Sequence, residues 1–389
     1  MKFSRTSAEN GLRTVFAAAF LAFIVAFACL LAPKLTARNV RHPAALFPLK
    51  KSFVELNGAC CRMGGRRLCN GVAKSGDGVL VNGSRVVLNG QERAAVRFAN
   101  WLKESDVEYV FVQAPGKMDL NLDLLPPCME YTAYHAANRL LETLSDAGVE
   151  TIDFRQEFAA DANRVAQYFY RTDHHWNNDA VFLAFKRIAA RLGYAVDGGD
   201  WTRSVVEDCF LGSKGRRTGR LFCGLDDMIL YRPKFKTRMS LDIPSANVHV
   251  SGSFLKTNMR NASKIRSGKA NGRAYSQAYV GEIAPIAFHR NGEAPVRLRV
   301  LMIGDSFVRP LEAFLSTAVT DLCVVDPRRY RKGTIADCVR SFKPDIVLQI
   351  QNPSALASDY MVGKPSGKAV FFAYGSPDEP ECSGSFRVD

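Results

Sequence analysis

The chain is poor in histidine and tryptophan, which account for six and three of its 389 residues. It is also short of acidic residues, with 38 against 52 basic ones and a formal net charge of +14. The basic residues are scattered, and no zinc knuckle, RRM signature or helix-turn-helix pattern accompanies their local clusters at 62–67, 214–220 and 328–332. We therefore expect no nucleic-acid partner. An anionic polymer or a membrane surface outside the cytosol explains the positive charge equally well.

No internal repeat is visible, and the composition is that of a folded protein. Hydrophobic residues make up 47% and charged residues 23% of the chain, which argues against a disordered polypeptide. A length of 389 residues is enough for one large domain or two moderate ones with a well-buried core.

An apolar run of 19 uncharged residues, 14–32, follows a basic N-terminus with Lys2, Arg5 and Arg13. The length suits a membrane span, and the basic flank favours a cytoplasmic N-terminus. We therefore expect residues 1–34 to be a cytoplasmic stub and a single-pass cell-membrane anchor, with the main domain outside. A cleaved signal peptide and a lipoprotein signal are the alternatives, and all three export the rest of the chain.

Cysteine usage agrees with export, because nine of the ten cysteines lie beyond the apolar run. Three sequence-near sets are candidate disulfides in an oxidising compartment: Cys60 or Cys61 with Cys69, Cys209 with Cys223, and Cys323 with Cys338. Pairing cannot be deduced from the sequence, and an odd number leaves at least one thiol over. The first set lacks the paired spacing of a zinc site.

After a cysteine-containing juxtamembrane linker at 35–75, apolar segments of strand and helix length alternate. This pattern predicts an α/β domain with a parallel central sheet covered on both faces. The domain spans 76–375, is interrupted by an irregular, β-rich insertion at about 200–295, and is followed by a polar tail at 376–389. The expected elements are a hairpin at 77–88 with a tight turn at Asn82-Gly83, strands at 108–113, 149–153, 296–303, 322–325, 345–351 and 369–374, and helices at 91–103, 131–147, 178–192, 310–318 and 334–342.

Ser306 is the candidate nucleophile. It follows the apolar strand at 296–303 and Gly304-Asp305, and it precedes a helix. A serine on such a strand-to-helix turn holds its hydroxyl out at the carboxyl end of a parallel sheet, where these sheets build their sites. The alternative is a simple helix cap made by Asp305 or Ser306.

The segment Tyr170 to Asn177 holds the candidate base, because two of the six histidines, His174 and His175, stand beside Asp173. In an extended loop, residues i and i+2 point the same way, so the carboxylate of Asp173 is expected to accept from the imidazole of His175 while His174 points away. A structural histidine pair and a zinc or manganese site are the alternatives. The metal site ranks well below the triad because no second acidic or histidine cluster is near, so we expect no metal and no cofactor.

These two motifs carry a resemblance. Thr172-Asp173-His174-His175-Trp176-Asn177 and, far downstream, Ile303-Gly304-Asp305-Ser306-Phe307 together resemble the DHHW family and the AlgX/AlgJ type of SGNH-hydrolase-like proteins. Looser similarity covers roughly residues 75 to 375. The resemblance implies an SGNH-like, flavodoxin-like three-layer α/β sandwich and acyl-ester chemistry, typically acetyl transfer, on extracellular polysaccharide.

Carried onto this chain, the resemblance makes Ser306 the nucleophile, His175 the base and Asp173 its partner. Asn352, after the strand at 345–351, is a candidate oxyanion donor, and Asp305, Trp176 and His174 are further oxyanion or substrate candidates. The glycine and asparagine oxyanion segments of ordinary SGNH enzymes are not cleanly present.

The expected function is that of a membrane-anchored O-acetyltransferase that modifies a cell-surface or exported polysaccharide through an acyl-serine. The resemblance implies an acetyl donor that passes through a membrane-bound O-acyltransferase. Two alternatives stay open, a secreted carbohydrate acetylesterase and a non-catalytic polysaccharide-binding scaffold subunit.

Overall fold

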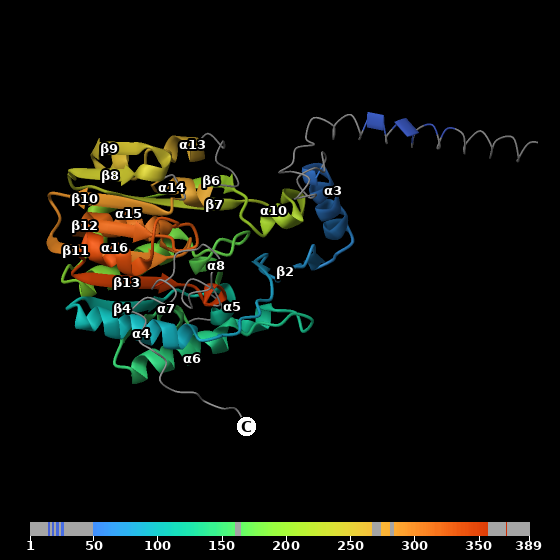
Figure 1. The fold of residues 1–389 in the computed structure, drawn as a ribbon. Helices are drawn as coiled ribbons and strands as arrows, with labels where there is room; N and C mark the ends of the chain where they lie inside the picture. Colours follow the sequence, from blue (N-terminus) through green and yellow to red (C-terminus); the bar gives the residue numbers. More distant parts are fainter. Residues whose placement is uncertain are drawn as a thin grey trace, which may run out of the picture.

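An eight-stranded sheet organises the computed structural model, with strand order β5-β4-β13-β11-β12-β10-β8-β9 (Figure 1). The structure describes residues 50–159, 165–266, 274–280 and 284–356, with Phe371 and, in the N-terminal apolar run, Val15, Ala18, Leu21, Ala22, Val25 and Ala26. The strands of this sheet are β4 (Glu108–Gln113), β5 (Glu150–Asp153), β8 (Met239–Ile243), β9 (Val248–Gly252), β10 (Ile286–Asn291), β11 (Val296–Gly304), β12 (Val319–Val325) and β13 (Ile346–Gln351).

Helices cover both faces of the sheet. The long ones are α4 (Gln91–Glu104), α6 (Ala133–Asp146), α9 (Asn178–Arg191), α15 (Val308–Ala318) and α16 (Ile335–Phe342). The other elements are α3 (Lys50–Met63), β1 (Leu68–Cys69), β2 (Val72–Lys74), β3 (Leu80–Val81), α5 (Lys117–Leu120), η3 (Leu122–Leu124), α7 (Phe154–Phe158), α8 (Val165–Tyr168), η5 (Gly198–Asp200), β6 (Trp201–Phe210), α10 (Gly215–Thr218), α11 (Arg220–Cys223), β7 (Asp226–Pro233), η6 (Pro244–Ala246), α12 (Phe254–Thr257), α13 (Ala262–Arg266), α14 (Ala274–Ala278) and η8 (Pro353–Ala355).

The predicted parallel sheet is confirmed. Strands β5, β4, β13, β11 and β12 pair in parallel, each with the next in that order. The insertion adds antiparallel strands to the same sheet, because β10 pairs with β12 and β8, and β8 pairs with β9. Strands β6 and β7 form a separate antiparallel pair. The insertion is therefore an extension of the sheet and is part of the same body.

The apolar runs of the central strands are buried on both faces because successive side chains point to opposite sides. In β4, Tyr109 and Phe111 belong to the core that contains residues of α4, α6 and α16. Val110 and Val112 belong to the opposite core, with residues of α9 and α15. The result is the three-layer α/β sandwich that the resemblance to SGNH hydrolases implies.

The hairpin predicted at 77–88 is wrong. Only β3 is a strand there, and it pairs with the preceding strand β2. The backbone after β3 bonds to a distant loop, since Ser84 N donates to the carbonyl of Glu130 at 2.9 Å and Thr132 N donates to that of Ser84 at 3.0 Å. These long-range bonds use the donors and acceptors that a local hairpin would have paired.

The cysteines expected to form disulfides are thiols. All eight cysteines within the described residues are free. Several of their sulfurs hydrogen-bond to local backbone, as Cys209 Sγ does to the carbonyl of Val206 at 3.2 Å and Cys223 Sγ to that of Gly219 at 3.3 Å. Cys29 and Cys382 lie outside the described residues.

Three other predicted segments also fall largely outside the described residues, namely the apolar run 14–32, the strand at 369–374 and the tail at 376–389. No helix within the described residues combines the length and hydrophobicity that crossing a bilayer requires. The membrane anchor therefore stays a prediction.

Gly304, the last residue of β11, provides a test of how tightly the sheet packs beneath the serine turn. A Cβ atom there would lie 2.7 Å from the carbonyl oxygen of Ile350 on β13. We expect Gly304→Ala to lower the free energy of unfolding by about 1–3 kcal/mol, because the two strands cannot separate without losing their ladder. Urea denaturation monitored by circular dichroism measures the change.

Gly198→Ala is the matched control, because a Cβ atom at Gly198 would meet nothing within 4 Å. We expect its effect to stay within about 0.5 kcal/mol, as for an ordinary surface substitution. Equal effects of the two substitutions would contradict the close approach at Gly304.

Candidate active site

Three side chains predicted to act together meet at one end of the sheet. Ser306 Oγ lies 2.7 Å from Nε2 of His175, and Nδ1 of the same ring lies 3.1 Å from Oδ1 of Asp173. The imidazole of His175 and the carboxylate of Asp173 are buried, and Ser306 is partly buried. Because a carboxylate only accepts hydrogen bonds, Nδ1 carries the ring proton and Nε2 is left to accept from the serine hydroxyl.

Ser306 lies on the turn between β11 and α15, at the carboxyl end of the strand. Asp305 holds this turn, because its Oδ1 accepts from Phe307 N at 2.8 Å. Its Oδ2 accepts from Nδ2 of Asn352 at 2.5 Å, which ties the turn to the end of the neighbouring strand β13. Both carboxylate oxygens of Asp305 therefore accept hydrogen bonds that hold the turn in place.

The loop that carries Asp173 and His175 is closed at its base by a bridge between Phe169 and Trp176. Asn177 then caps α9, with its Oδ1 accepting from the amides of Asp179 and Ala180 at 3.1 Å each. Such a cap fixes where the helix begins and therefore where the preceding loop ends.

Trp176 joins the two halves of the site. Its indole Nε1 donates to the carbonyl of Phe307 at 3.1 Å, and the side chain is completely buried. This bond connects the histidine loop to the turn that carries Ser306. The part of Trp176 as an oxyanion or substrate contact stays a prediction.

Asp226 in β7 holds the other side of the histidine loop, and the sequence offered no signal for it. Its carboxylate accepts from the backbone amides of Arg171 and Thr172 at 2.8 Å each and from the hydroxyl of Thr172 at 2.6 Å. The same hydroxyl accepts from Gly212 N at 2.8 Å. The loop is therefore built against residues of the insertion.

The carboxylate of Asp173 receives further bonds from Ser213, whose amide donates to Oδ2 and whose hydroxyl donates to Oδ1, each at 3.1 Å. Gly212 allows this approach, because a Cβ atom there would lie 2.6 Å from the amide nitrogen of Asp173. The segment 210–213 belongs to the looser similarity described above, but no role was predicted for it.

The prediction that His174 points away from Asp173 is wrong. Its Nδ1 lies 2.8 Å from Asp173 Oδ1 and 2.7 Å from Ser213 Oγ, and its ring lies 3.8 Å from that of His175. The reason is that the segment is bent and not extended, so the rings of both His174 and His175 reach the carboxylate of Asp173. His174 remains 44% exposed and is the histidine of the pair that solvent reaches.

Tyr275 in α14 is a residue of the site that the sequence did not reveal. Its ring stacks on that of His175, with 4.0 Å between centroids and 13° between planes. Its hydroxyl donates to the carbonyl of Phe307 at 3.4 Å. Tyr275 thus fixes the plane of the imidazole and shields one of its faces from water.

The charges of the pair are set by burial and by neighbours. Burial lowers the pKa of His175 from its ordinary 6.5 to about 4, and the charges of His174 and Arg328 lower it too, against the opposing effect of Asp173. Burial by itself would raise the pKa of Asp173, but the charge of His175 and hydrogen bonds from both imidazoles hold it well below its usual range. Near neutral pH the carboxylate is therefore charged and the imidazole of His175 is neutral, as a general base requires.

Asp173, His174 and His175 also form a group of metal-ligand type within the described residues, with candidate ligand atoms within 4.8 Å of one another. The Nδ1 atoms of both rings already contact the same carboxylate oxygen. A metal ion bound between them would displace these contacts, and the arrangement fits a hydrogen-bonded set better than a metal centre.

Asn352, predicted as an oxyanion donor, is next to the serine turn. Its Nδ2 contacts Asp305, and its Oδ1 accepts from Ser354 N at 3.0 Å. One amide hydrogen of Nδ2 is left over by these contacts. Its part in oxyanion binding stays a prediction.

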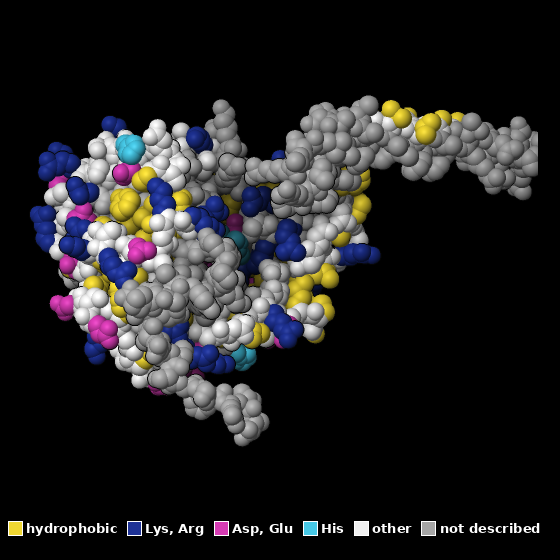
Figure 2. Space-filling model, in the orientation of Figure 1, with side chains coloured by type: hydrophobic (Ala, Val, Ile, Leu, Met, Phe, Trp, Pro, Cys, Tyr) yellow, Lys and Arg dark blue, Asp and Glu magenta, His cyan; other side chains and the backbone are white. Residues whose placement is uncertain are grey.

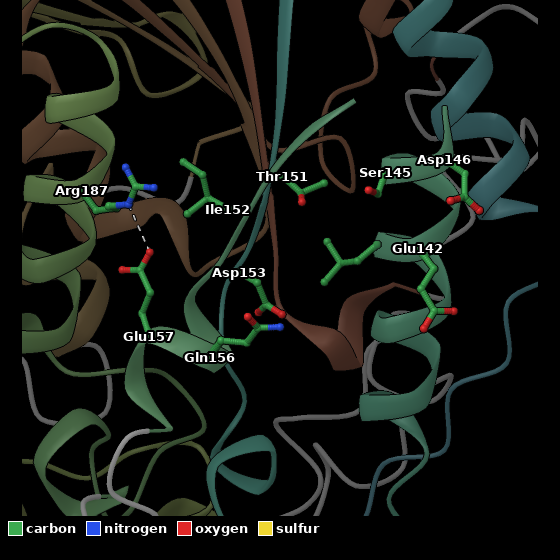
Figure 3. A pocket seen from close by; sticks show the side chains of 10 residues that line it. Glu142, Ser145, Asp146, Thr151, Ile152, Asp153, Gln156, Glu157 and Arg187 are labelled. Carbon is green, nitrogen blue, oxygen red and sulfur yellow. Dashed lines mark hydrogen bonds and ion pairs between the residues drawn. The ribbon is translucent and has the colours of Figure 1, made fainter. Parts of the chain in front are cut away.

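A hollow of about 650 Å³ lies away from these residues, between α6, β5 and α7 (Figure 3). Its lining includes Glu142, Asp146, Asp153 and Glu157, and the ion pair from Arg187 to Glu157 crosses one side of it at 3.2 Å. Asp173, His175 and Ser306 do not line this hollow.

Residues 77–204 match a family model described as the SGNH hydrolase-like domain of the acetyltransferase AlgX. The resemblance is confirmed. The matched segment contains Asp173 and His175 and ends before Ser306. No curated protein sequence matches the chain significantly.

Solved structures have a similar fold. PatB1 of Bacillus cereus is 20% identical with a TM-score of 0.62, covering 75% of this chain and 98% of its own. The same protein with a sulfonyl adduct gives 19% identity, the same TM-score and coverages of 75% and 96%. A DHHW family protein of Eubacterium siraeum is 14% identical with a TM-score of 0.59, covering 76% of this chain and 94% of its own.

The ionisation of His175 is directly testable by NMR titration of histidine ring signals. We expect His175 to titrate well below pH 6.5, because burial opposes the charged ring. In His174→Gln its midpoint should rise, since one of the neighbouring positive charges is gone, and should stay below 6.5 because the burial remains. The neutral base is then present above the midpoint and lost as the pH falls through it.

His249→Gln is the matched control, because His249 also lies 3.1 Å from an aspartate, Asp242, but is exposed and far along the chain. It should leave the midpoint of His175 unchanged. A midpoint of 6.5 or above in the unsubstituted protein would contradict the burial of a neutral ring.

Proposed function

We propose that this protein transfers an acyl group, most simply acetyl, to hydroxyls of a cell-surface or exported polysaccharide, with Ser306 as nucleophile. The single observation that carries the proposal is the continuous chain of hydrogen bonds from Asp173 through His175 to Ser306, at 3.1 and 2.7 Å. The family model that matches residues 77–204 is that of an acetyltransferase domain, which favours acetyl as the group.

In the first step His175 Nε2 takes the proton of Ser306 while Oγ attacks the carbonyl carbon of the acyl donor. The ionised carboxylate of Asp173 stabilises the imidazolium that forms. As the donor's C–O bond breaks, the imidazolium returns the proton to the leaving oxygen, and the acyl group stays on Ser306 as an ester.

In the second step a sugar hydroxyl replaces the leaving group. His175 takes its proton, its oxygen attacks the acyl carbon, and Ser306 leaves as the product ester forms and recovers a proton from the ring. Water in place of the sugar gives hydrolysis by the same residues. Exclusion of water therefore distinguishes a transferase from an esterase, and the stacking of Tyr275 on His175 contributes to it on one face.

A positive potential around the site supports a polymeric substrate with anionic groups. The charge of Arg328 is close enough to lower the pKa of His175. Burial lowers the pKa of Lys214 to about 8, and the charge of Asp173 nearby opposes that shift. Figure 2 shows Lys and Arg side chains gathered in the middle of this face, between the main body and α3. Such a field raises the local concentration of an anionic glycan.

We also propose that residues 14–32 anchor the protein in the cell membrane with the described domain outside. The uncharged run and its basic flank support this placement. An acetyl donor for an exported enzyme has to be delivered across that membrane, and a membrane-bound O-acyltransferase is the partner that would do so.

The acyl-serine mechanism is tested with a chromogenic acetyl ester. Ser306→Ala and His175→Ala should each lower kcat/KM by about a thousandfold or more, because nucleophile and base act as one unit. Ser105→Ala and His249→Ala are controls at an exposed helix end and an exposed ion pair, and should keep the activity. If both site variants cleave the ester no more slowly than the unsubstituted protein, this mechanism is excluded. That result would favour a non-catalytic binding subunit.

Transfer is separated from hydrolysis by adding oligosaccharides to the same assay and analysing them by mass spectrometry. A transferase should move acetyl groups onto sugar hydroxyls, with a matching fall in free acetate. Free acetate alone, with no acetylated sugar at any acceptor concentration, would assign the chain to the carbohydrate acetylesterases. Both products must disappear in Ser306→Ala.

A further inference from the structure

One face of helix α3 exposes apolar side chains to solvent. Phe53, Leu56, Cys60 and Met63 recur at spacings of three, four and three, which places them on a single face of a helix. Leu56 and Met63 are 60% and 79% exposed. A face of this kind costs free energy in water unless something covers it.

The opposite face of α3 is attached firmly to the main body. The carboxylate of Glu55 accepts from the amides of Arg220 and Leu221 at 2.9 and 3.0 Å, and Arg62 donates to the carbonyl of Leu221 at 3.2 Å. Gly58 and Cys61 are the buried residues of the helix. The exposed face is therefore presented by a helix that is held in place from behind.

Two leucines of nearby segments are exposed as well. Leu68, which follows α3, is 46% exposed, and Leu221 in α11, whose carbonyl accepts from Arg62, is 47% exposed. Figure 2 shows hydrophobic side chains along this edge of the molecule, where Figure 1 has α3. We call the exposed face of the helix the α3 surface, and it comprises Leu56, Cys60 and Met63.

The segment that carries the α3 surface is rich in basic residues. Residues 50–69 contain five basic side chains and one acidic one, Glu55, which is engaged with α11. All five basic residues are exposed: Lys50, Lys51, Arg62, Arg66 and Arg67. Apolar side chains on one face of a helix, in a segment rich in Lys and Arg, are the pattern of helices that lie in the interface of an anionic bilayer.

The position of α3 along the chain points to the same partner. Seventeen residues, 33–49, lie between the apolar run 14–32 and Lys50. A chain of that length reaches at most about 60 Å when fully extended, so α3 stays close to any membrane that holds the apolar run. A second copy of this chain would bring a surface of the same positive charge, which opposes self-association through this area.

We propose that the α3 surface rests on the lipid headgroups of an anionic membrane, with Leu56 and Met63 inserted at the boundary of the acyl chains. This goes beyond acyl transfer and does not depend on it. Because α3 bonds to α11 and Gly215 N bonds to the carbonyl of Thr172 at 2.9 Å, such contact also sets the orientation of the histidine loop relative to the membrane. The domain would then work in one fixed orientation on the lipid surface.

The test uses the full chain reconstituted into vesicles whose lipids carry brominated acyl chains, which quench nearby indoles. Leu56→Trp places an indole on the α3 surface, and Leu183→Trp is the matched control on α9, where Leu183 is 44% exposed. In vesicles of phosphatidylcholine and phosphatidylglycerol we expect the new indole of Leu56→Trp to lose most of its fluorescence and that of Leu183→Trp to keep it.

Charge dependence is the second measurement. Replacing Lys50 and Lys51 by Ser in the Leu56→Trp background should lower the ratio of quenched to unquenched protein about fivefold for each basic residue removed. High salt should also lower the ratio of quenched to unquenched protein, since salt screens the headgroup charge. Met63→Trp, at a position that is 79% exposed, repeats the test should Leu56→Trp fold poorly.

Three results would overturn the proposal. Equal quenching of the Leu56→Trp and Leu183→Trp indoles would remove any preference for the α3 surface. An indole at position 56 that is shielded in detergent solution, without vesicles, would mean that another part of this chain covers the surface. Shielding that grows with protein concentration and is unaffected by lipid charge would assign the surface to a second copy.

Discussion

The burial of the Asp173 carboxylate is the constraint on which the site depends. A buried anion costs several kcal/mol unless hydrogen bonds and positive charge compensate it. Here the compensation comes from the His175 ring, the His174 backbone and ring, and the amide and hydroxyl of Ser213. Because these donors belong to two segments about 40 residues apart, the histidine loop and the segment after β6 have to be assembled together.

The insertion is thus part of the machinery and of the fold. It supplies Ser213 beside the carboxylate, Asp226 beneath the loop and Tyr275 on the imidazole. It also contributes three of the eight strands of the sheet. Deleting it would remove the partners of a buried charge as well as an edge of the core, so the domain cannot be reduced to its parallel half.

The packing of the insertion against the histidine loop also explains why His175 is neutral and Asp173 is charged. The ring of His175 is enclosed by Tyr275, Phe307 and His174, which leaves little water to stabilise a positive charge. Asp173 keeps its charge because its oxygens face donors. His175 is thereby kept unprotonated and Asp173 ionised, although the two groups are in contact. A neutral imidazole beside an ionised carboxylate is what proton transfer from a serine hydroxyl requires.

Local sequence was sufficient for the main elements of the fold. Residues such as Val110 and Phe111 in β4, or Val181 and Phe185 in α9, follow strand and helix periods that the surrounding core only reinforces. The proximity of Ser306 to Asp173 and His175 could also be predicted from the sequence. Residues at the carboxyl ends of neighbouring strands, and in the loops that follow them, converge at one edge of a parallel sheet.

Tertiary structure decided what depends on contacts between distant segments. The hairpin at 77–88 failed because Ser84 bonds to the loop at Glu130 and Thr132, and no local pattern records that competition. His174 turned toward Asp173 because the loop bends between the supports given by Asp226 and Trp176. Sequence determined which side chains are chemically able to form the site. Only the folded chain decided which of them are buried, which share a carboxylate, and which, like Tyr275, arrive from an insertion with no recognisable motif.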